Sequence, residues 1–343
     1  MQYRFFTNSK KAWTNMYQAI SSAQSSVFFE MYIFEDNTVG FDFVNLLAEK
    51  AKSGVKVKIL LDSFGSFDLP NERVAVLREA GAEVLFFSRF LHRVHRKILV
   101  VDNKVAFTGG MNVNRGATDW RDIVVVMKGF MVSRLVKLFA KDYESAGGKD
   151  PLVLSYRKRK FIHNAKSWLI EHSPIRKRFD MSKAYRKYIN EAEQEIIIVT
   201  PYFAPKRWFM ALLEQAALRG VRVEIVVPEK TEDTLLDKCN YFYMSRLNHP
   251  GIKFLLEPFM NHAKVLLIDG KLGLIGSQNM DFLSSELNAE VGVFITDQSA
   301  IHRLYSIVNI WKKDVILFEP KNYRLSWWDR ILANFLNFFV KMI

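Results

Sequence analysis

Short apolar segments alternate with helical patterns along the first part of the chain. Residues 27–32 and 54–61 are apolar and partly β-branched, as buried strands require. Between them, residues 43–51 place apolar residues and Ala at helical spacing. A third apolar segment ends at Asp102-Asn103, a two-residue turn signal, and residues 104–108 then return. The pattern predicts a strand, a helix, a second strand and a β-hairpin.

The same order of elements recurs about 167 residues later, which is too long a period for a solenoid and indicates duplicated domains. The second unit has a strand at 196–202, a helix at 210–217, a strand at 220–227 and a hairpin turn at Asp269-Gly270. Alternating strands and helices predict an α/β fold, with two domains that are each a mixed β-sheet flanked by helices.

These units divide the chain into four predicted segments. We expect a first half at 1–150, a basic and aromatic connector at 151–182, a second half at 183–320 and an amphipathic tail at 321–343. On a helix, the tail would place its polar residues on one narrow face and Trp, Phe, Ile and Leu over the rest, a pattern typical of interfacial helices. The tail is therefore a candidate membrane anchor, and packing on the protein's own core is the alternative.

One set of polar residues accompanies each hairpin at matching spacing. Lys follows His by two residues, Asp follows Lys by five, Gly follows Asp by seven and Asn follows Gly by three. The two sets are His95, Lys97, Asp102, Gly109 and Asn112, and His262, Lys264, Asp269, Gly276 and Asn279. Residues two apart on a strand share a face, so the His and Lys of each set point the same way. We interpret both Asp residues as structural, because they lie at the turns.

Two histidines and two lysines that meet at one place suit covalent chemistry on a phosphodiester. Lys97 and Lys264 would neutralise the phosphoryl oxygens, and Asn112 and Asn279 would donate hydrogen bonds to them. One neutral imidazole would attack phosphorus to form a phosphohistidine, while the other, protonated, would deliver its proton to the leaving alkoxide. The near-symmetry of the two sets leaves open which histidine plays which part.

The motifs resemble those of the phospholipase D superfamily, whose pattern is His-x-Lys-x4-Asp-x6-Gly-x2-Asn, and among its members the bacterial cardiolipin synthases. Further segments carry the resemblance: residues 30–34, 54–62, 109–112, 120–122, 200–205, 276–281 and 287–290. It implies two halves related by a pseudo-twofold axis with one shared active site, His95 as the nucleophile and His262 as the acid. Asp122 and Glu290 would then orient the imidazoles. Gly110 departs from the general pattern, which has Ser there.

Composition narrows the choice of partner. The 343 residues carry a net charge of +13, which suits nucleic acid or anionic lipid. Because basic residues alternate with large apolar ones in the connector and the tail, we expect an anionic membrane surface and no nucleic acid. The single cysteine, Cys239, excludes an intramolecular disulfide framework. No metal-binding or Walker motif is present, so we expect no metal and no cofactor, and we infer no obligate protein partner.

The resemblance implies a phosphatidyltransferase that makes cardiolipin from two phosphatidylglycerol molecules and releases glycerol. The alternative is a phosphodiesterase of the same fold that hydrolyses phospholipid or nucleic acid. A non-enzymatic lipid-binding module is disfavoured, because a binding protein needs no matched pair of histidines. Phosphatidylethanolamine remains open as a donor. No charge-free apolar run reaches the roughly 18–20 residues that span a bilayer, and no secretory signal is recognisable. We therefore expect peripheral attachment to the cytoplasmic face of a bacterial cell membrane.

Overall fold

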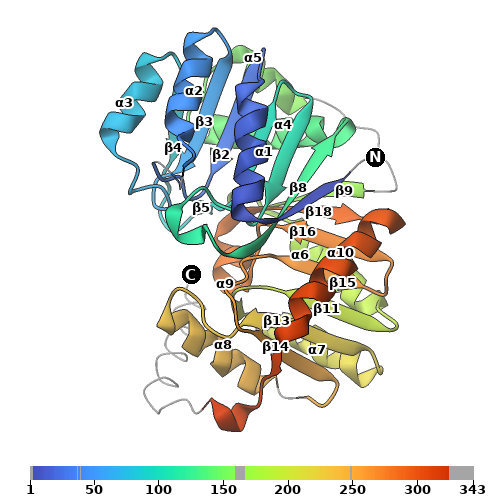
Figure 1. Cartoon of the computed structure of the whole chain (residues 1–343). Coiled ribbons are helices and arrows are strands. Elements are labelled where there is room, and N and C mark those ends of the chain that lie inside the picture. Colours follow the sequence, from blue (N-terminus) through green and yellow to red (C-terminus); the bar gives the residue numbers. More distant parts are fainter. Residues whose placement is uncertain (1–2, 37, 39, 159–166, 248, 324–343) are drawn as a thin grey trace.

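The computed structural model describes residues 3–36, 38, 40–158, 167–247 and 249–323. Residues 324–343, which make up most of the predicted tail, and part of the predicted connector lie outside these residues. Figure 1 shows two α/β halves, one above the other, with the first half in blue to green and the second in yellow to red. Among the described residues, no helix has the length and apolar character needed to cross a bilayer.

The first half is built on one mixed sheet. Within the described residues it has seven strands in the order β1-β8-β7-β6-β2-β3-β4. Their bounds are Arg4–Asn8 (β1), Ser26–Met31 (β2), Lys56–Asp62 (β3), Glu83–Phe87 (β4), Ile98–Val101 (β6), Val105–Gly109 (β7) and Arg121–Lys128 (β8). One face packs against the helices Ser9–Ser21 (α1), Phe43–Lys52 (α2) and Asn71–Glu79 (α3). The other packs against Phe130–Ser145 (α4), which precedes the short helix Pro151–Ser155 (α5).

The second half repeats this plan with a larger sheet. Within the described residues its main path is β10-β9-β18-β16-β15-β11-β13-β14-β19. The bounds are Ser167–Ser173 (β9), Arg178–Phe179 (β10), Glu195–Val199 (β11), Arg222–Pro228 (β13), Ile252–Glu257 (β14), Val265–Ile268 (β15), Leu272–Gly276 (β16), Asn288–Ile295 (β18) and Ile316–Leu317 (β19). One face packs against Asp180–Glu191 (α6), Arg207–Leu218 (α7) and Thr234–Arg246 (α8), and the other against Gln298–Trp311 (α10). Phe203–Ala204 (β12) pairs with Met280–Asp281 (β17) just before the short helix Phe282–Glu286 (α9).

Strand directions confirm the predicted duplication and the fold class. Strand β2 pairs parallel with β3 and antiparallel with β6, and β11 pairs likewise with β13 and β15. Both predicted hairpins form, β6 with β7 and β15 with β16. Asp102, Asn103, Asp269 and Gly270 all have positive φ, between 51° and 62°, as a two-residue hairpin turn requires.

The described residues of the predicted connector are divided between the two halves: α5 packs against α4 of the first half, whereas the residues from 167 onward join the second. Strand β9 pairs antiparallel with β18 through residues 167–172 and extends the second sheet. Arg176, in the basic stretch that follows, forms ion pairs with Asp142 and Glu171. Basic residues surround this strand, so the sequence did not indicate it. The fold brings carboxylates close to these residues and neutralises them.

The two halves are joined by shared structure and not only by the chain. Strand Arg93–Val94 (β5) leaves the first half and pairs parallel with β18 of the second. At the other motif, Arg121 of the first half forms a parallel bridge with Asn261 of the second half. Buried residues of α4 and α10 belong to one continuous apolar core. Segments next to both histidine motifs therefore meet at the boundary between the halves.

Candidate active site

Each histidine is held by the backbone of the other half. The backbone N–H of His95 donates to the carbonyl oxygen of Ala289 at 3.0 Å, and that of His262 donates to the carbonyl oxygen of Arg121 at 2.7 Å. His95 lies shortly before β6 and His262 shortly before β15, so the same local geometry is used twice. The two motifs thereby face each other at the centre of the molecule.

The side chain of each histidine also contacts a carboxylate of the opposite half. The Nδ1 atom of His95 lies 2.9 Å from Oε1 of Glu290, and that of His262 lies 2.9 Å from Oδ2 of Asp122. All four side chains are buried. Both carboxylates that the sequence suggested therefore touch an imidazole, and each touches the imidazole of the opposite half.

The lysines and asparagines complete the site. The Nζ atom of Lys97 donates to the carbonyl oxygen of His95 at 2.6 Å, and that of Lys264 donates to the carbonyl oxygen of His262 at 2.5 Å. Asn112 follows β7 and Asn279 follows β16, and both are buried. The backbone N–H of Ile33 donates to Oδ1 of Asn112. The Nδ2 group of Asn112 therefore remains to donate to a substrate. All six residues proposed to act on the substrate line the boundary between the halves or border it.

The two motif aspartates lie elsewhere, at the far ends of the hairpins. Asp102 accepts hydrogen bonds from the backbone N–H groups of Gln24, Ser25 and Ser26 at 2.7–3.2 Å. Asp269 accepts the equivalent three bonds from residues 193–195 at 2.9 Å. These bonds hold the pKa of each carboxyl below its ordinary value, although burial acts in the other direction. Both residues fix the hairpin to the start of the neighbouring strand.

Burial makes the charged forms of the basic residues unfavourable. It lowers the pKa of His95 to about 4 and that of His262 well below its ordinary value. It also lowers the pKa of Lys97 to about 7 and that of Lys264 to about 8. An anionic phosphodiester between the two lysines would favour their charged forms. Because the lysines are buried, their electrostatic attraction to an anion is stronger than that of lysines exposed to water.

The two carboxylates differ although their positions are equivalent. Burial raises the pKa of Asp122 to about 7. Burial acts on Glu290 in the same direction, but His95, Lys97 and Ser277 together bring its pKa below the ordinary value. Near neutral pH, Glu290 is therefore ionised and Asp122 is close to half protonated.

Ser277 and Gly110 account for part of this difference. The Ser277 hydroxyl donates to Oε2 of Glu290, a bond that the sequence did not predict. At the equivalent place in the first half, a Cβ atom on Gly110 would lie 2.4 Å from Oδ1 of Asp122 and 2.9 Å from the carbonyl oxygen of His262. Only glycine fits there, which explains why this motif departs from the general pattern.

Further residues around the site were missed by the sequence reading. The Tyr32 ring lies 4.6 Å from that of His95, and the Trp120 and Tyr202 rings lie 5.6 and 6.2 Å from that of His262. The internal repeat held a signal for the tyrosines, since each follows the first strand of its unit.

Arg96, between the two motif residues His95 and Lys97, was also missed, and no pattern marked it. Its fully buried guanidinium donates to the carbonyl oxygens of Glu290 and His172 and pairs with Asp142. It therefore ties β18, which carries Glu290, to the first half.

The carboxylates and histidines of the site are not arranged as a metal centre. Across the part of the chain that the structure describes, no group of three or more His, Cys, Asp or Glu side chains is placed to hold an ion. The expectation that the site needs no metal stays a prediction.

Two α/β halves around one shared site define the phospholipase D type of fold, and solved structures share it. The phosphatidylserine synthase of Haemophilus influenzae superposes with a TM-score of 0.77 over 99% of this chain and 94% of that chain, at 14% identity. A polyphosphate kinase from Porphyromonas gingivalis superposes with a TM-score of 0.67 over 100% of this chain and 54% of that one, at 12% identity. At these identities the likeness concerns the fold alone.

Sequence comparison identifies the family. Residues 16–145 and 185–311 match the family described as "Cardiolipin synthase, PLD-like domain". The chain is 31% identical over 315 residues to the probable cardiolipin synthase YwiE of Bacillus subtilis, and 30% identical over 323 residues to a cardiolipin synthase of Geobacillus kaustophilus. These alignments cover 87% and 88% of this chain but only 63% and 64% of the relatives. The chain belongs to the phospholipase D superfamily, in the family of cardiolipin synthase PLD-like domains.

Proposed function

We propose that the protein is a phosphatidyltransferase that makes cardiolipin from two phosphatidylglycerol molecules, with release of glycerol and a phosphohistidine on His95. The observation that carries this proposal is the pair of crossed His–carboxylate contacts, in which the pKa of Glu290 is lowered and that of Asp122 is raised. The names of the relatives supply the lipid substrate.

The environment of His95 favours its role as nucleophile. An ionised Glu290 accepts the Nδ1 proton of His95, so the lone pair lies on Nε2. When Nε2 attacks phosphorus, a P–N bond forms, the bond to the glycerol oxygen breaks and the imidazole becomes positively charged. Glu290 stabilises this charge where it develops.

The environment of His262 favours its role as acid. The pKa of Asp122 is about 7, so its protonated form is available at neutral pH. That form donates its O–H to Nδ1 of His262, which leaves the ring proton on Nε2. As this proton passes to the leaving glycerol oxygen, the Asp122 proton moves to Nδ1, so His262 stays neutral and Asp122 becomes ionised. In the second step a hydroxyl of the second phosphatidylglycerol returns a proton to His262 as its oxygen attacks phosphorus and the P–N bond breaks.

The lysines and asparagines act on the phosphoryl oxygens. Lys97 and Lys264 are buried, so their charges are poorly screened and act strongly on an anion between them. Asn112 and Asn279 add hydrogen-bond donors. Exchange of one phosphodiester for another is close to isoenergetic, so the scheme needs no nucleotide energy source.

Exposed aromatic residues favour a lipid substrate over a nucleic acid. Phe64, Phe67 and Phe90 follow strands β3 and β4 and are 61%, 74% and 88% exposed, and Phe259, which follows β14, is 52% exposed. We call these four residues the aromatic rim. The guanidinium of Arg93, two residues before His95, lies 4.6 Å from the Phe64 ring, and that of Arg121, beside Asp122, lies 4.7 Å from the Phe259 ring.

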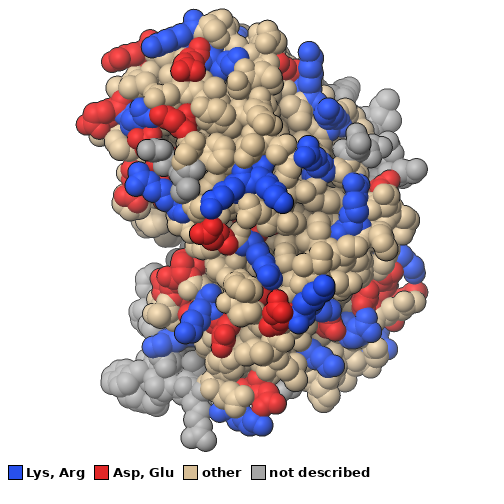
Figure 2. All heavy atoms as spheres, viewed as in Figure 1, with Lys and Arg blue, Asp and Glu red and all other residues tan. Residues whose placement is uncertain are grey.

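Aromatic side chains next to arginines suit the surface of an anionic membrane. Figure 2 shows Lys and Arg spread over both halves of the face viewed and mixed with Asp and Glu. On that face the positive charge is thus not gathered in one stripe. Peripheral attachment at the aromatic rim, on the cytoplasmic side of a bacterial membrane, completes the proposal.

The alternative function is hydrolysis of a phospholipid or of nucleic acid, with water in place of the second lipid. The test is incubation of the purified protein with phosphatidylglycerol vesicles, followed by lipid mass spectrometry, with His95→Ala as the inactive control. We expect cardiolipin and glycerol in equal amounts. Phosphatidic acid without cardiolipin would instead support the hydrolase, and cleavage of nucleic acid with no lipid product would support the nuclease.

A further inference from the structure

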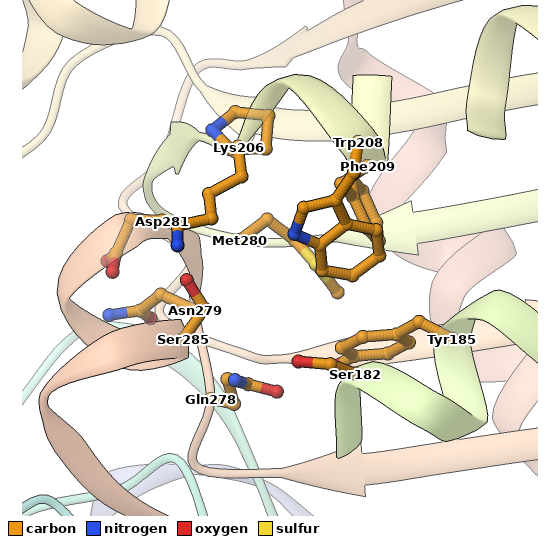
Figure 3. Close-up of a pocket in the computed structure, with 11 residues that line it drawn as sticks. Ser182, Tyr185, Lys206, Trp208, Phe209, Gln278, Asn279, Met280, Asp281 and Ser285 are labelled. Carbon is orange, nitrogen blue, oxygen red and sulfur yellow. The ribbon is translucent and has the colours of Figure 1, made fainter. Parts of the chain in front are cut away.

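A pocket lies in the second half, beside the proposed catalytic residues. Figure 3 shows Ser182 and Tyr185 of α6 facing Trp208 and Phe209 of α7, with Met280 between them and Gln278 beside Ser182. The indole nitrogen of Trp208 points into this space. The pocket thus has aromatic walls and polar groups along one side, which is an arrangement that suits a small polyol.

The pocket leads toward the proposed phosphate site. An adjoining cavity shares Tyr185, Gln278 and Met280 with it and is also lined by Lys264. Asn279 lines the main pocket itself. A group in this pocket would therefore lie next to a phosphate held by Lys264 and Asn279, on the side of the molecule that carries His262.

The first half is filled by a tryptophan at the equivalent place. Ser26 and Glu195 are equivalent residues, since the backbone N–H of each donates to the motif aspartate of its half. Trp13 precedes Ser26 by the same thirteen residues that separate Ser182 from Glu195. Trp13 is fully buried and donates its indole N–H to the carbonyl oxygen of Asn112 at 3.0 Å. Its counterpart, Ser182, is too small to do this.

Within the described part of the chain, two side-chain carbonyl oxygens of the polar wall accept no hydrogen bond. Among the described residues, neither Oε1 of Gln278 nor Oδ1 of Asn279 has a hydrogen-bond partner, although both atoms are buried. The Nε2 group of Gln278 donates to the carbonyl oxygen of Ser284 at 3.0 Å, which fixes the amide so that Oε1 is its free end. Buried carbonyl oxygens without donors are unfavourable, so the pocket is suited to a ligand with hydroxyl groups. In the first half, Met111 replaces Gln278.

We propose that this pocket binds the glycerol headgroup of phosphatidylglycerol, first as the leaving alcohol and then as the attacking one. This inference rests on the proposed function for the identity of the polyol. It places the alcohol oxygen next to His262, which has to give it a proton in the first step and take one in the second.

The direct test is saturation-transfer NMR with glycerol as the probe, which needs no turnover. Ser182→Trp should refill the pocket as Trp13 does in the first half and abolish the glycerol signal. Gln278→Met should weaken glycerol binding about fivefold, through loss of one hydrogen-bond acceptor, and it serves should Ser182→Trp fail to fold. Asn190→Trp, at an exposed position on the same helix, is the matched control and should bind glycerol as the unmodified protein does.

A second measurement connects the pocket to the reaction. The protein is incubated with phosphatidylglycerol vesicles and deuterated glycerol, and label entering the lipid is measured. Ser182→Trp should lower this exchange about tenfold or more, and Asn190→Trp should leave it unchanged. A glycerol NMR signal that is equal in the unmodified protein and in both pocket variants would overturn the inference. So would a signal from octanoate, lost in Ser182→Trp, where glycerol gives none, since that would assign the pocket to an acyl chain.

The two proposals fail separately in these experiments. Glycerol binding that disappears in Ser182→Trp supports the pocket even if no cardiolipin is formed, and that result would contradict only the proposed transferase. Cardiolipin formation with unaltered exchange in Ser182→Trp would contradict only the pocket.

Discussion

The Nδ1 atom of His95 lies 2.9 Å from the Oε1 atom of Glu290, which is 195 residues further along the chain. The equivalent contact runs the other way, from His262 to Asp122. Neither half alone holds a complete His–carboxylate pair, so the site exists only because the halves dock. In the proposed scheme, this crossed arrangement gives the two neutral histidines different tautomers, with the proton on Nδ1 of His95 and on Nε2 of His262.

Replacement of Glu290 by Gln should slow formation of the phosphohistidine. The substitution keeps the shape but removes the negative charge that stabilises the imidazolium, so we expect a loss of about 100-fold or more in the initial release of glycerol. Rapid-quench measurement on phosphatidylglycerol checks this. Glu72→Gln, on the exposed face of α3, is the control. Equal rates in the two variants would show that Glu290 does not support His95.

Substitution by Ala should lower turnover more at Gly110 than at Ser277. Ala at Gly110 would push against Asp122 and the backbone of His262, and a displacement of about 1 Å can lower turnover about 100-fold. Ala at Ser277 keeps the space and loses one hydrogen bond to a charged group, for which we expect about a tenfold loss. Steady-state kinetics on phosphatidylglycerol vesicles compares them. A Gly110→Ala variant as active as the unmodified protein would refute the close approach of Gly110 and Asp122.

Asp122 should make stability depend on pH in a defined direction. Its pKa is raised from the ordinary 3.8 to about 7, so the native state keeps its proton where the unfolded chain has lost it. The stability linked to Asp122 is fully present below pH 3.8 and falls as the pH rises to about 7. Asp122→Asn does not titrate. Its melting temperature relative to the unmodified protein should therefore rise between these values and then level off.

Thermal unfolding across this pH range provides the measurement. Asp119→Asn is the control, because the Asp119 side chain is 88% exposed. A difference between Asp122→Asn and the unmodified protein that does not change with pH would show that Asp122 has an ordinary pKa.

The aromatic rim should matter for vesicle binding. Phe67→Ser with Phe90→Ser removes two exposed aromatic side chains and should weaken binding to phosphatidylglycerol vesicles about tenfold or more. Leu218→Ser is the matched control, because Leu218 is 73% exposed but lies at the end of α7 that leads into β13, away from the site. Co-sedimentation at fixed salt compares the variants. An equal loss in both would show that the rim has no special role.

The sequence predicted what is local and repeated. Hairpins at Asp102 and Asp269 follow from turn residues between apolar strands, and the two His-x-Lys sets follow from their spacing. The family and the fold class are confirmed, whereas the roles of the site residues stay predictions.

What the sequence did not predict depends on contacts between distant segments. The crossing of Glu290 and Asp122 to the opposite histidines requires the docked halves. Strand β9 was not predicted, because basic residues surround it in the sequence. The pocket in the second half arises because Ser182 stands where the first half has Trp13, a difference that has no meaning until both helices are placed on their sheets.

The most direct test of the central claim is to locate the covalent intermediate. His262→Asn removes the proposed acid, and the second step should slow enough for a phosphatidyl adduct to accumulate during incubation with phosphatidylglycerol. After digestion without acid, mass spectrometry should find this adduct on His95, and it should be absent when His95→Asn is combined with His262→Asn. An adduct on His262 in the His95→Asn variant, with none on His95 in the His262→Asn variant, would reverse the two roles and contradict the account.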